Sequence, residues 1–174
     1  MVFCFWYTVI MKNHSEKERR EFIKSLPRKR SASGVVLRNN KGEWLLLQTT
    51  YHGGKYTFPG GITNQYESPW RGVIREVKEE INIDIHKNDL SLLTITSISD
   101  PKNNDELVIY YFDGGVLDTH QINSIQVDGE EIQDYKFVSQ DRVLGFLRDT
   151  AHYSYGHISE ALKKNKILMI DVEK

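Results

Sequence analysis

Three glutamates, Glu76, Glu79 and Glu80, lie within a run of five residues whose surroundings repeat apolar side chains at helical spacing. At about 100° per residue, their carboxylates share an arc of about 100° on one helix face. The apolar side chains form a separate stripe, which predicts an amphipathic helix up to Ile81 with Ser68 as a plausible N-cap and Pro69 at the first helical position. The stripe consists of Trp70, Val73, Ile74, Val77 and Ile81. Hard divalent cations such as Mg²⁺ take carboxylate ligands and bridge them to phosphates. Without an ion, the same pattern describes a solvated acidic face.

Gly72 falls on the acidic side of this helix, one turn before Glu76. A glycine inside a helix lowers stability by about 1 kcal/mol relative to alanine. The missing side chain predicts room above the carboxylates for an ion or a phosphate.

The spacing around the glutamates is specific. Gly61 is followed by five residues, Glu67, seven residues and then the run Arg75 to Ile83. This arrangement resembles the Nudix box, the signature of the Nudix (MutT-like) hydrolases, G-x5-E-x7-R-E-U-x-E-E-x-G-U with U aliphatic. Asn82 stands at the one departure, where the family has glycine. Asn is the next-best residue for the left-handed backbone expected after a helix end, so we expect a small loss of stability there and no loss of catalysis.

The resemblance covers roughly residues 30–147 and implies a reaction. Nudix hydrolases use Mg²⁺ or Mn²⁺ to direct water onto a phosphorus of a nucleoside diphosphate derivative. The substrate implied is a nucleoside triphosphate, an oxidised nucleotide or a compound resembling ADP-ribose. The alternative is a catalytically silent nucleotide-sensing module with the same fold. Members that have lost activity usually lack box glutamates, and all three are present here, which favours the enzyme.

The resemblance also implies roles for individual residues. Glu76 and Glu80 correspond to the principal metal ligands and Glu79 to a third, and the carbonyl of Gly60 supplies another oxygen. Glu67 is either a ligand near a second metal or the ion-pair partner that holds the loop onto Arg75.

The general base is open between Glu76, Glu79 and a carboxylate from a later loop. Glu131, in the acidic cluster 128–131, is the candidate from that loop, and a solvated loop is the alternative. With Arg75, these residues are the expected catalytic group.

Substrate binding is expected from the loop between the first strands and the box. Tyr51 and Tyr56 offer rings for a base to stack on, and Lys55 offers a cation for a phosphate. The alternative is a glycine-rich surface loop with a packed Tyr56.

The remaining pattern predicts the elements that must position these residues. An apolar, β-branched run at 34–38 and a second apolar run at 44–47 flank a turn and predict a hairpin. Further strands are expected at 90–98, 106–112 and 135–138, helices at 141–147 and 159–164, and a strand or helix end at 167–172. Strands interspersed with a few helices indicate an α/β or α+β layered sandwich. The resemblance implies an α/β/α sandwich with a mixed central sheet.

The 174 residues fit one domain, expected at 30–174. An N-terminal extension, 1–29, combines an apolar run with a polar helix from Glu16 to Leu26. The apolar run is an added strand or hydrophobic hook, a start-site artefact with Met11 as the first residue, or a short membrane anchor. A net charge of −1 argues against a nucleic-acid polymer or a membrane surface as partner. The single cysteine excludes an intrachain disulfide. We expect a cytoplasmic protein with a small nucleotide as partner, and the resemblance alone suggests a homodimer.

Overall fold

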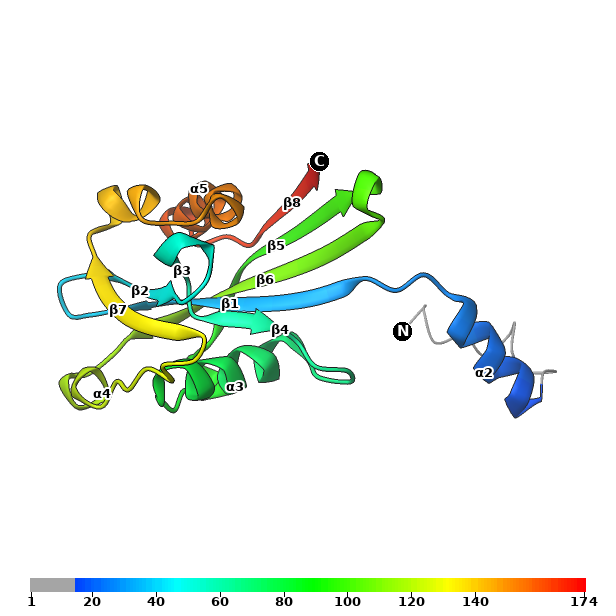
Figure 1. Ribbon diagram of the computed structural model, residues 1–174, viewed down its shortest axis with the longest axis horizontal. Helices are drawn as coiled ribbons and strands as arrows, with labels where there is room; N and C mark the ends of the chain where they lie inside the picture. Colours follow the sequence, from blue (N-terminus) through cyan, green and yellow to red (C-terminus); the bar gives the residue numbers. More distant parts are fainter. Residues whose placement is uncertain (1–14) are drawn as a thin grey trace.

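The computed structural model describes residues 15–174, and its centre is one mixed sheet (Figure 1). Its strands run in the order β3-β2-β1-β6-β5-β8, with β4 pairing to β1 and β7 pairing to β2. The strands are β1 (Arg30–Arg38), β2 (Trp44–Thr49), β3 (Tyr56–Thr57), β4 (Gly60–Ile62), β5 (Ser91–Asp100), β6 (Asp105–Val116), β7 (Ile132–Val138) and β8 (Leu168–Glu173).

Helices cover both faces of this sheet. Figure 1 shows α3 (Pro69–Ile81) and α4 (Thr119–Asn123) on one face and α5 (Asp149–Lys164) on the other. Four short 3-10 helices complete the described elements: η1 (His52–Gly54), η2 (Lys87–Asp89), η3 (Pro101–Asn103) and η4 (Gln140–Gly145). The arrangement confirms the expected α/β/α sandwich with a mixed central sheet.

The alternating side chains of β1 hold the two layers together. Val35 and Leu37 pack with Val73, Val77 and Ile81 of α3, whereas Val36 packs with Ile158 of α5. Because helices cover both faces, the successive residues from Ala32 to Leu37 are all buried, and the strand contains an unbroken apolar run, Val35 to Leu37. This central strand is therefore the fixed frame on which the box helix is mounted.

The sheet divides along one edge of β1. Near its C-terminal end β1 pairs with β2, at Arg38 opposite Trp44, and near its other end it pairs with β4. The segment from β3 to β4 crosses between the two branches and is fixed there by a hydrogen bond from the Val35 N–H to the Pro59 carbonyl (3.0 Å). This division brings the residues before the box against the middle of β1.

Most predicted elements are present, with two corrections. The helix expected at 159–164 begins at Asp149, and the helix expected at 141–147 is a 3-10 segment at 140–145. Of the two alternatives for 167–172, the strand is the one that forms, as β8. The short elements β3, β4 and α4 were not predicted. They lack room for a periodic pattern, and β3 and β4 exist through pairing with distant strands.

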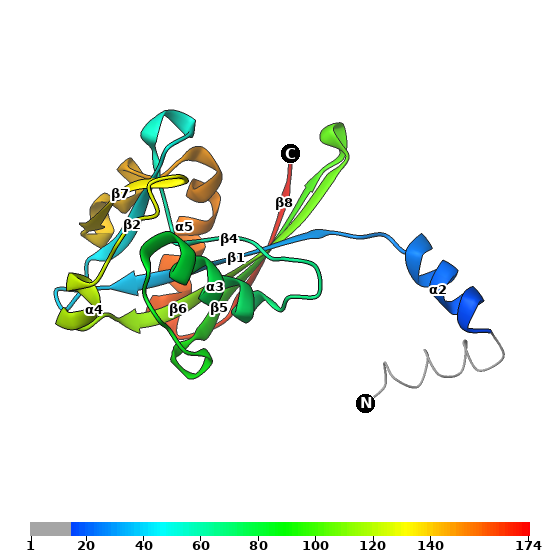
Figure 2. The same cartoon turned by 60° about the horizontal axis from the view of Figure 1, so that its bottom comes forward.

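The polar helix expected before the domain is α2 (Glu16–Ser25), which begins with a capping box in which Ser15 and Glu18 exchange hydrogen bonds. It extends away from the sheet at the start of β1 in both views (Figures 1 and 2). The apolar run predicted at 1–11 lies outside the described residues. Within 15–174, no helix is long and apolar enough to cross a membrane.

Candidate active site

The box helix α3 forms where its periodicity placed it. Ser68 is its N-cap residue, although its side chain makes no capping hydrogen bond, and Pro69 occupies the first turn, where a missing N–H is harmless. The apolar stripe packs on the sheet. Glu80 lies at the border of that stripe and is only 5% exposed, whereas the side chain of Glu79 is 57% exposed. The three glutamates thus share a face but differ strongly in their access to water.

The departure from the box is accommodated by the backbone. Asn82 ends α3 in the left-handed conformation (φ 58°, ψ 26°) and its N–H donates to the Lys78 carbonyl.

We expect Asn82→Gly to keep activity and to leave the melting temperature unchanged or raised, because glycine adopts this conformation without strain. Asn82→Val is the control and should lower the melting temperature, since β-branched residues are strained there. Thermal unfolding of both variants tests this, and a clear loss of stability in Asn82→Gly would contradict it.

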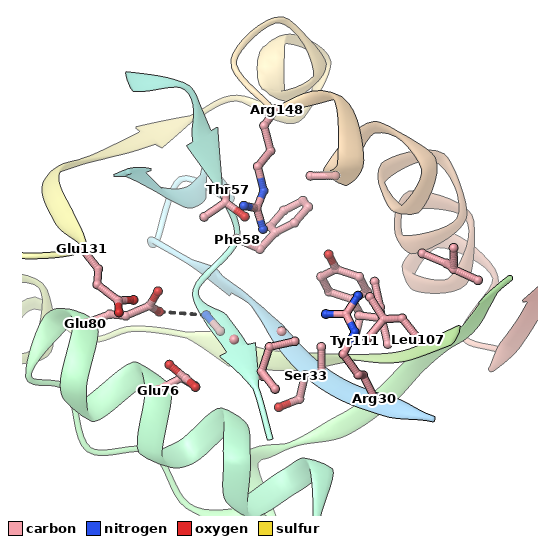
Figure 3. Close-up of a pocket in the computed structure, with 18 of the residues that line it drawn as sticks. Arg30, Ser33, Thr57, Phe58, Glu76, Glu80, Leu107, Tyr111, Glu131 and Arg148 are labelled. Atoms are coloured by element: carbon pink, nitrogen blue, oxygen red, sulfur yellow. Dashed lines mark hydrogen bonds between the residues drawn. The ribbon is translucent and has the colours of Figure 1, made fainter. Parts of the chain in front are cut away.

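A cavity of about 710 Å³ opens between α3, β1, β6 and the start of α5. Its size falls in the range of small-molecule sites. Figure 3 shows Glu76, Glu80 and Glu131 at one end and Tyr111, Leu107 and Arg30 at the other. Ser33 lies between them, and Arg148 enters from α5.

Glu80 is fixed at the acidic end by the chain before the box. The Gly60 N–H donates to Glu80 Oε2 at 2.8 Å, and Gly60 has a φ of +133°, where an added Cβ would lie 2.2 Å from the Ser33 carbonyl oxygen. Burial raises the pKa of Glu80 to about 8, and the charges of Glu76, Asp128 and Glu131 add to the rise while the Gly60 hydrogen bond opposes it. Burial and the neighbouring carboxylates therefore make the ionised form of Glu80 costly when no cation is bound.

This raised pKa predicts a pH dependence for the metal-free protein. Between the usual carboxyl pKa of 4.5 and about 8, the folded state binds a proton at Glu80 that the unfolded state has released. Stability must then fall as pH rises through that window. We expect the melting temperature without metal to decline from pH 5 to pH 8 more steeply in the parent than in Glu80→Gln. Equal slopes in a chelator-treated melting series would contradict the prediction.

Glu76 is held between a glycine and an arginine. A Cβ on Gly61 would lie 2.7 Å from the Glu76 carboxyl carbon, so only glycine leaves this carboxylate where it is. Arg75 Nη1 donates to Glu76 Oε1 at 2.9 Å and to Glu79 Oε2 at 2.7 Å. Burial raises the pKa of Glu76, Arg75 opposes that rise, and Glu79 and Glu131 add to it.

Arg75 also ties the preceding loop to α3. Its Nε and Nη2 donate to the two oxygens of Glu67 at 3.1 and 3.0 Å, and the Asn64 N–H donates to Glu67 at 2.8 Å. These bonds lower the pKa of Glu67 and raise that of Arg75. Arg75 lines the cavity and Glu67 does not. The geometry thus favours the ion-pair interpretation of Glu67 over a metal-ligand role.

The prediction that Gly72 leaves room for an ion or a phosphate is wrong. An added Cβ would meet Thr63 Cγ2 at 2.7 Å, Ser33 Oγ at 3.1 Å and Glu67 Oε2 at 3.3 Å. The glycine therefore allows α3 to pack closely against β1 and the box loop, and it leaves no space for an ion. A helical wheel places residues on a face but contains no information on the neighbouring segment that fills the gap.

The acidic loop predicted as a source of the base reaches the cavity. Asp128 Oδ1 accepts hydrogen bonds from the N–H groups of Glu130, Glu131 and Ile132 at 2.8 to 3.1 Å. The Thr50 N–H donates to the Glu131 carbonyl at 2.9 Å, which fixes the loop to the end of β2. Glu131 lines the cavity with its side chain directed toward Glu80 (Figure 3).

The three expected substrate residues separate in the structure. Tyr51 lines the cavity. Lys55 is exposed and does not line it. Tyr56 is buried in the core, with its ring edge-on to Phe146. The packed alternative for Tyr56 therefore fits the structure, and a base cannot stack on a ring that the core covers.

Several residues of the cavity carried no signal in the sequence. Ser33 comes from β1, Tyr111 from β6, and Arg148 precedes α5. The Tyr111 ring lies against Gly34, where a Cβ would come within 2.6 Å of it. Strands separated by some 75 residues meet here through the parallel pairing of β1 with β6, and no local pattern marks such a meeting.

The donor set suits a hard divalent cation. The charge of Glu131 adds to the raised pKa of both Glu76 and Glu80, and carboxylate oxygens are the ligands that Mg²⁺ prefers. No three acidic, histidine or cysteine side chains between residues 15 and 174 are already gathered as an ion site. In that arrangement Arg75 is bonded to Glu76 and Glu79, so binding an ion through them requires their side chains to reorient.

The family described as "NUDIX domain" matches residues 28–162 of the chain. Among solved structures, a MutT protein from Methanosarcina mazei Go1 is 27% identical, with a TM-score of 0.63 over 82% of this chain and 99% of its own. The NUDIX domain of Shewanella oneidensis NrtR, solved with ADP ribose, is 18% identical, with a TM-score of 0.66 over 86% and 99%. A C. elegans Ap4A hydrolase is 23% identical, with a TM-score of 0.57 over 78% and 98%. No curated protein matches the chain significantly.

Proposed function

The chain belongs to the NUDIX domain family, and on that premise we propose that it hydrolyses the diphosphate linkage of a nucleoside diphosphate derivative with the help of Mg²⁺ or Mn²⁺. The observation that carries this proposal is the gathering of the carboxyl groups of Glu76, Glu80 and Glu131 at one end of the cavity. Burial raises the pKa of Glu80 to about 8, so its ionised form is costly without a cation. A bound cation would stabilise that ionised form and at the same place attract a polyanionic substrate.

Glu76, Glu80 and the carbonyl oxygen of Gly60 would hold the ion, with Glu79 completing the set. The ion, when bound, neutralises the diphosphate and acidifies the attacking water. The hydrogen bond from Gly60 fixes Glu80 before substrate arrives, so the helix supplies position as well as charge. Arg75 and Glu67 keep the loop and helix in register.

In the reaction, the water oxygen forms a bond to phosphorus and the bridging P–O bond breaks. The water proton passes to a carboxylate, for which Glu131 is the candidate from the loop and Glu76 and Glu79 are the candidates from the helix. Two phosphate-containing products leave. The exposed position of Glu131 allows it to exchange that proton with solvent after each turnover.

The substrate class is the finer part of the proposal. Relatives of similar fold are named for Ap4A hydrolysis and for ADP-ribose pyrophosphatase activity. We therefore include nucleoside triphosphates, oxidised nucleotides, dinucleoside polyphosphates and ADP-ribose among the candidate substrates. Of the three residues expected to bind the substrate, Tyr51 is the one that lines the cavity.

The test is product release from a nucleotide panel with Mg²⁺, with Mn²⁺ and with chelator. We expect a nucleoside monophosphate to appear for at least one substrate, in the metal-containing reactions only. Identification of both products by mass spectrometry names the bond that breaks. Metal-independent release, or release from none of the compounds, would contradict the proposal.

A nucleotide-sensing module without turnover is the second candidate. It is favoured by the similarity to a NUDIX domain solved with ADP ribose bound. Calorimetry with ADP-ribose, together with the product assay above, separates the two candidates. Binding of ADP-ribose without release of any product favours the sensor.

We also propose that residues 30–174 form the hydrolase domain and that 1–29 are an extension to it. A chain shortened to begin at residue 28, where the family match begins, should keep its turnover. A cytoplasmic location and a homodimeric state stay predictions, which cell fractionation and light scattering test.

A further inference from the structure

Arg148 is a cation of the cavity that neither the box nor the acidic loop explains. Its backbone is anchored on both sides: the Arg148 N–H donates to the Tyr56 carbonyl at 2.9 Å, and the Tyr56 N–H donates to the Phe146 carbonyl at 3.1 Å. A bridge between Tyr56 and Leu147 adds to this short parallel pairing. The Arg148 carbonyl accepts from the Ala151 N–H at 2.9 Å as α5 begins. The origin of the side chain is therefore fixed relative to β3.

The side chain extends from that anchor into the cavity. Figure 3 shows the guanidinium beside Thr57 and Phe58, on the side of the cavity away from α3. Its Nε is buried and has no hydrogen-bond partner. A buried donor without a partner destabilises a protein by about 1–3 kcal/mol, and by more when it is charged. The unsatisfied Nε therefore calls for a partner that the described residues do not supply.

The other arginines of the cavity are already neutralised. Arg75 is bonded to three glutamates, and Arg30 pairs with Asp105. Among the described residues, no carboxylate forms an ion pair with Arg148. Its charge does reach Tyr111, where it partly offsets the rise in pKa that burial produces. The cavity thus has an acidic end on α3 and an unpaired guanidinium on the α5 side.

We propose that Arg148 binds phosphoryl oxygens of the substrate from the α5 side, opposite the carboxylates that hold the metal ion. A guanidinium presents planar N–H donors that match the oxygens of a phosphoryl group, and charge-assisted bonds of this kind are the strong ones. This proposal rests on the proposed function for its choice of ligand. Arg148 would contribute mainly to substrate affinity, and the carboxylates mainly to turnover.

The test measures binding in the absence of turnover, so that it remains informative even if the hydrolase proposal fails. The probes are α,β-methylene-ADP, which cannot be cleaved at its diphosphate bridge, and methylenediphosphonate, which has no nucleoside. Both are titrated by calorimetry in the presence of Mg²⁺. We expect Arg148→Gln to weaken both at least about tenfold, since one charge-assisted contact of this kind is worth that much.

Arg142→Gln is the matched control. Arg142 lies in η4 with its guanidinium over the Phe146 ring and does not line the cavity, so both probes should bind as in the parent. Mn²⁺ binding without nucleotide, followed by electron paramagnetic resonance, should be the same in both variants and the parent. That readout separates loss of a phosphoryl contact from collapse of the site.

Two results would overturn the proposal. Unchanged affinity of Arg148→Gln for both probes means that Arg148 does not touch the substrate. Weakened binding of the nucleotide alone, with unchanged methylenediphosphonate binding, assigns Arg148 to the base or ribose instead.

If Arg148→Gln does not fold, Arg148→Lys replaces it. We expect Arg148→Lys to bind both probes measurably more weakly than the parent, because the charge stays and the planar donors are lost. Parent-like affinity of Arg148→Lys would overturn the proposal. If the panel assay finds an active enzyme, KM should rise in the variant with kcat nearly unchanged.

Discussion

Replacement of Glu80 by glutamine is expected to lower turnover at least about a hundredfold, because it removes a carboxylate ligand from the ion that activates water. The fold should survive. The glutamine side chain has the same shape, and its amide oxygen can still accept the hydrogen bond that Gly60 donates to Glu80 Oε2. Removal of a buried negative charge beside Glu76 and Glu131 should, if anything, raise the melting temperature of the metal-free protein at pH 8. Activity and stability therefore move in opposite directions.

Steady-state kinetics with Mg²⁺ and thermal unfolding of the same preparation measure both effects. Glu160→Gln is the matched control, since Glu160 is bonded to Lys164 on α5 and does not line the cavity; its turnover should equal that of the parent. Near-normal activity in a folded Glu80→Gln protein would show that Glu80 is not a ligand of the catalytic ion.

Substitution of Gly61 by alanine is expected to lower turnover at least about tenfold while leaving the protein folded. The new Cβ would lie 2.7 Å from the carboxyl carbon and Oε1 of Glu76, so the carboxylate must move. It is the far end of a flexible side chain, and Gly61 has no positive φ, so the backbone has no reason to change. A displacement of about 1 Å at a catalytic group is enough to reduce rates strongly.

Gly156→Ala is the control for adding a methyl group. Gly156 lies inside α5, and a Cβ there meets nothing within 4 Å. Alanine should therefore keep full turnover and stabilise the helix by up to about 1 kcal/mol. Kinetics and chemical denaturation of the pair give the comparison. Gly61→Ala turnover equal to that of Gly156→Ala would show that Glu76 need not occupy its position for catalysis.

Local patterns along the chain were enough to predict the acidic helix and its end. Apolar periodicity, with Ser68 as the cap and Pro69 as the first helical residue, placed α3 correctly, because a helix of thirteen residues repeats its pattern several times. The left-handed Asn82 was predictable for the same reason, since it depends on the end of a single helix. The box spacing led to the family that the comparison established.

The residues that surround the glutamates depend on long-range packing and were not predictable from local patterns. Tyr56 looked available for a substrate and is buried, Gly72 looked like open space and is filled by Thr63, and Arg148 carried no pattern yet lines the cavity. The parallel pairing of β1 with β6 and the anchoring of the α5 start to β3 bring these groups together. Such contacts join residues far apart along the chain, and short-range periodicity contains no information about them. Local sequence thus specified the chemistry of the acidic end of the cavity. Long-range packing specified the shape and charge of the rest of the cavity.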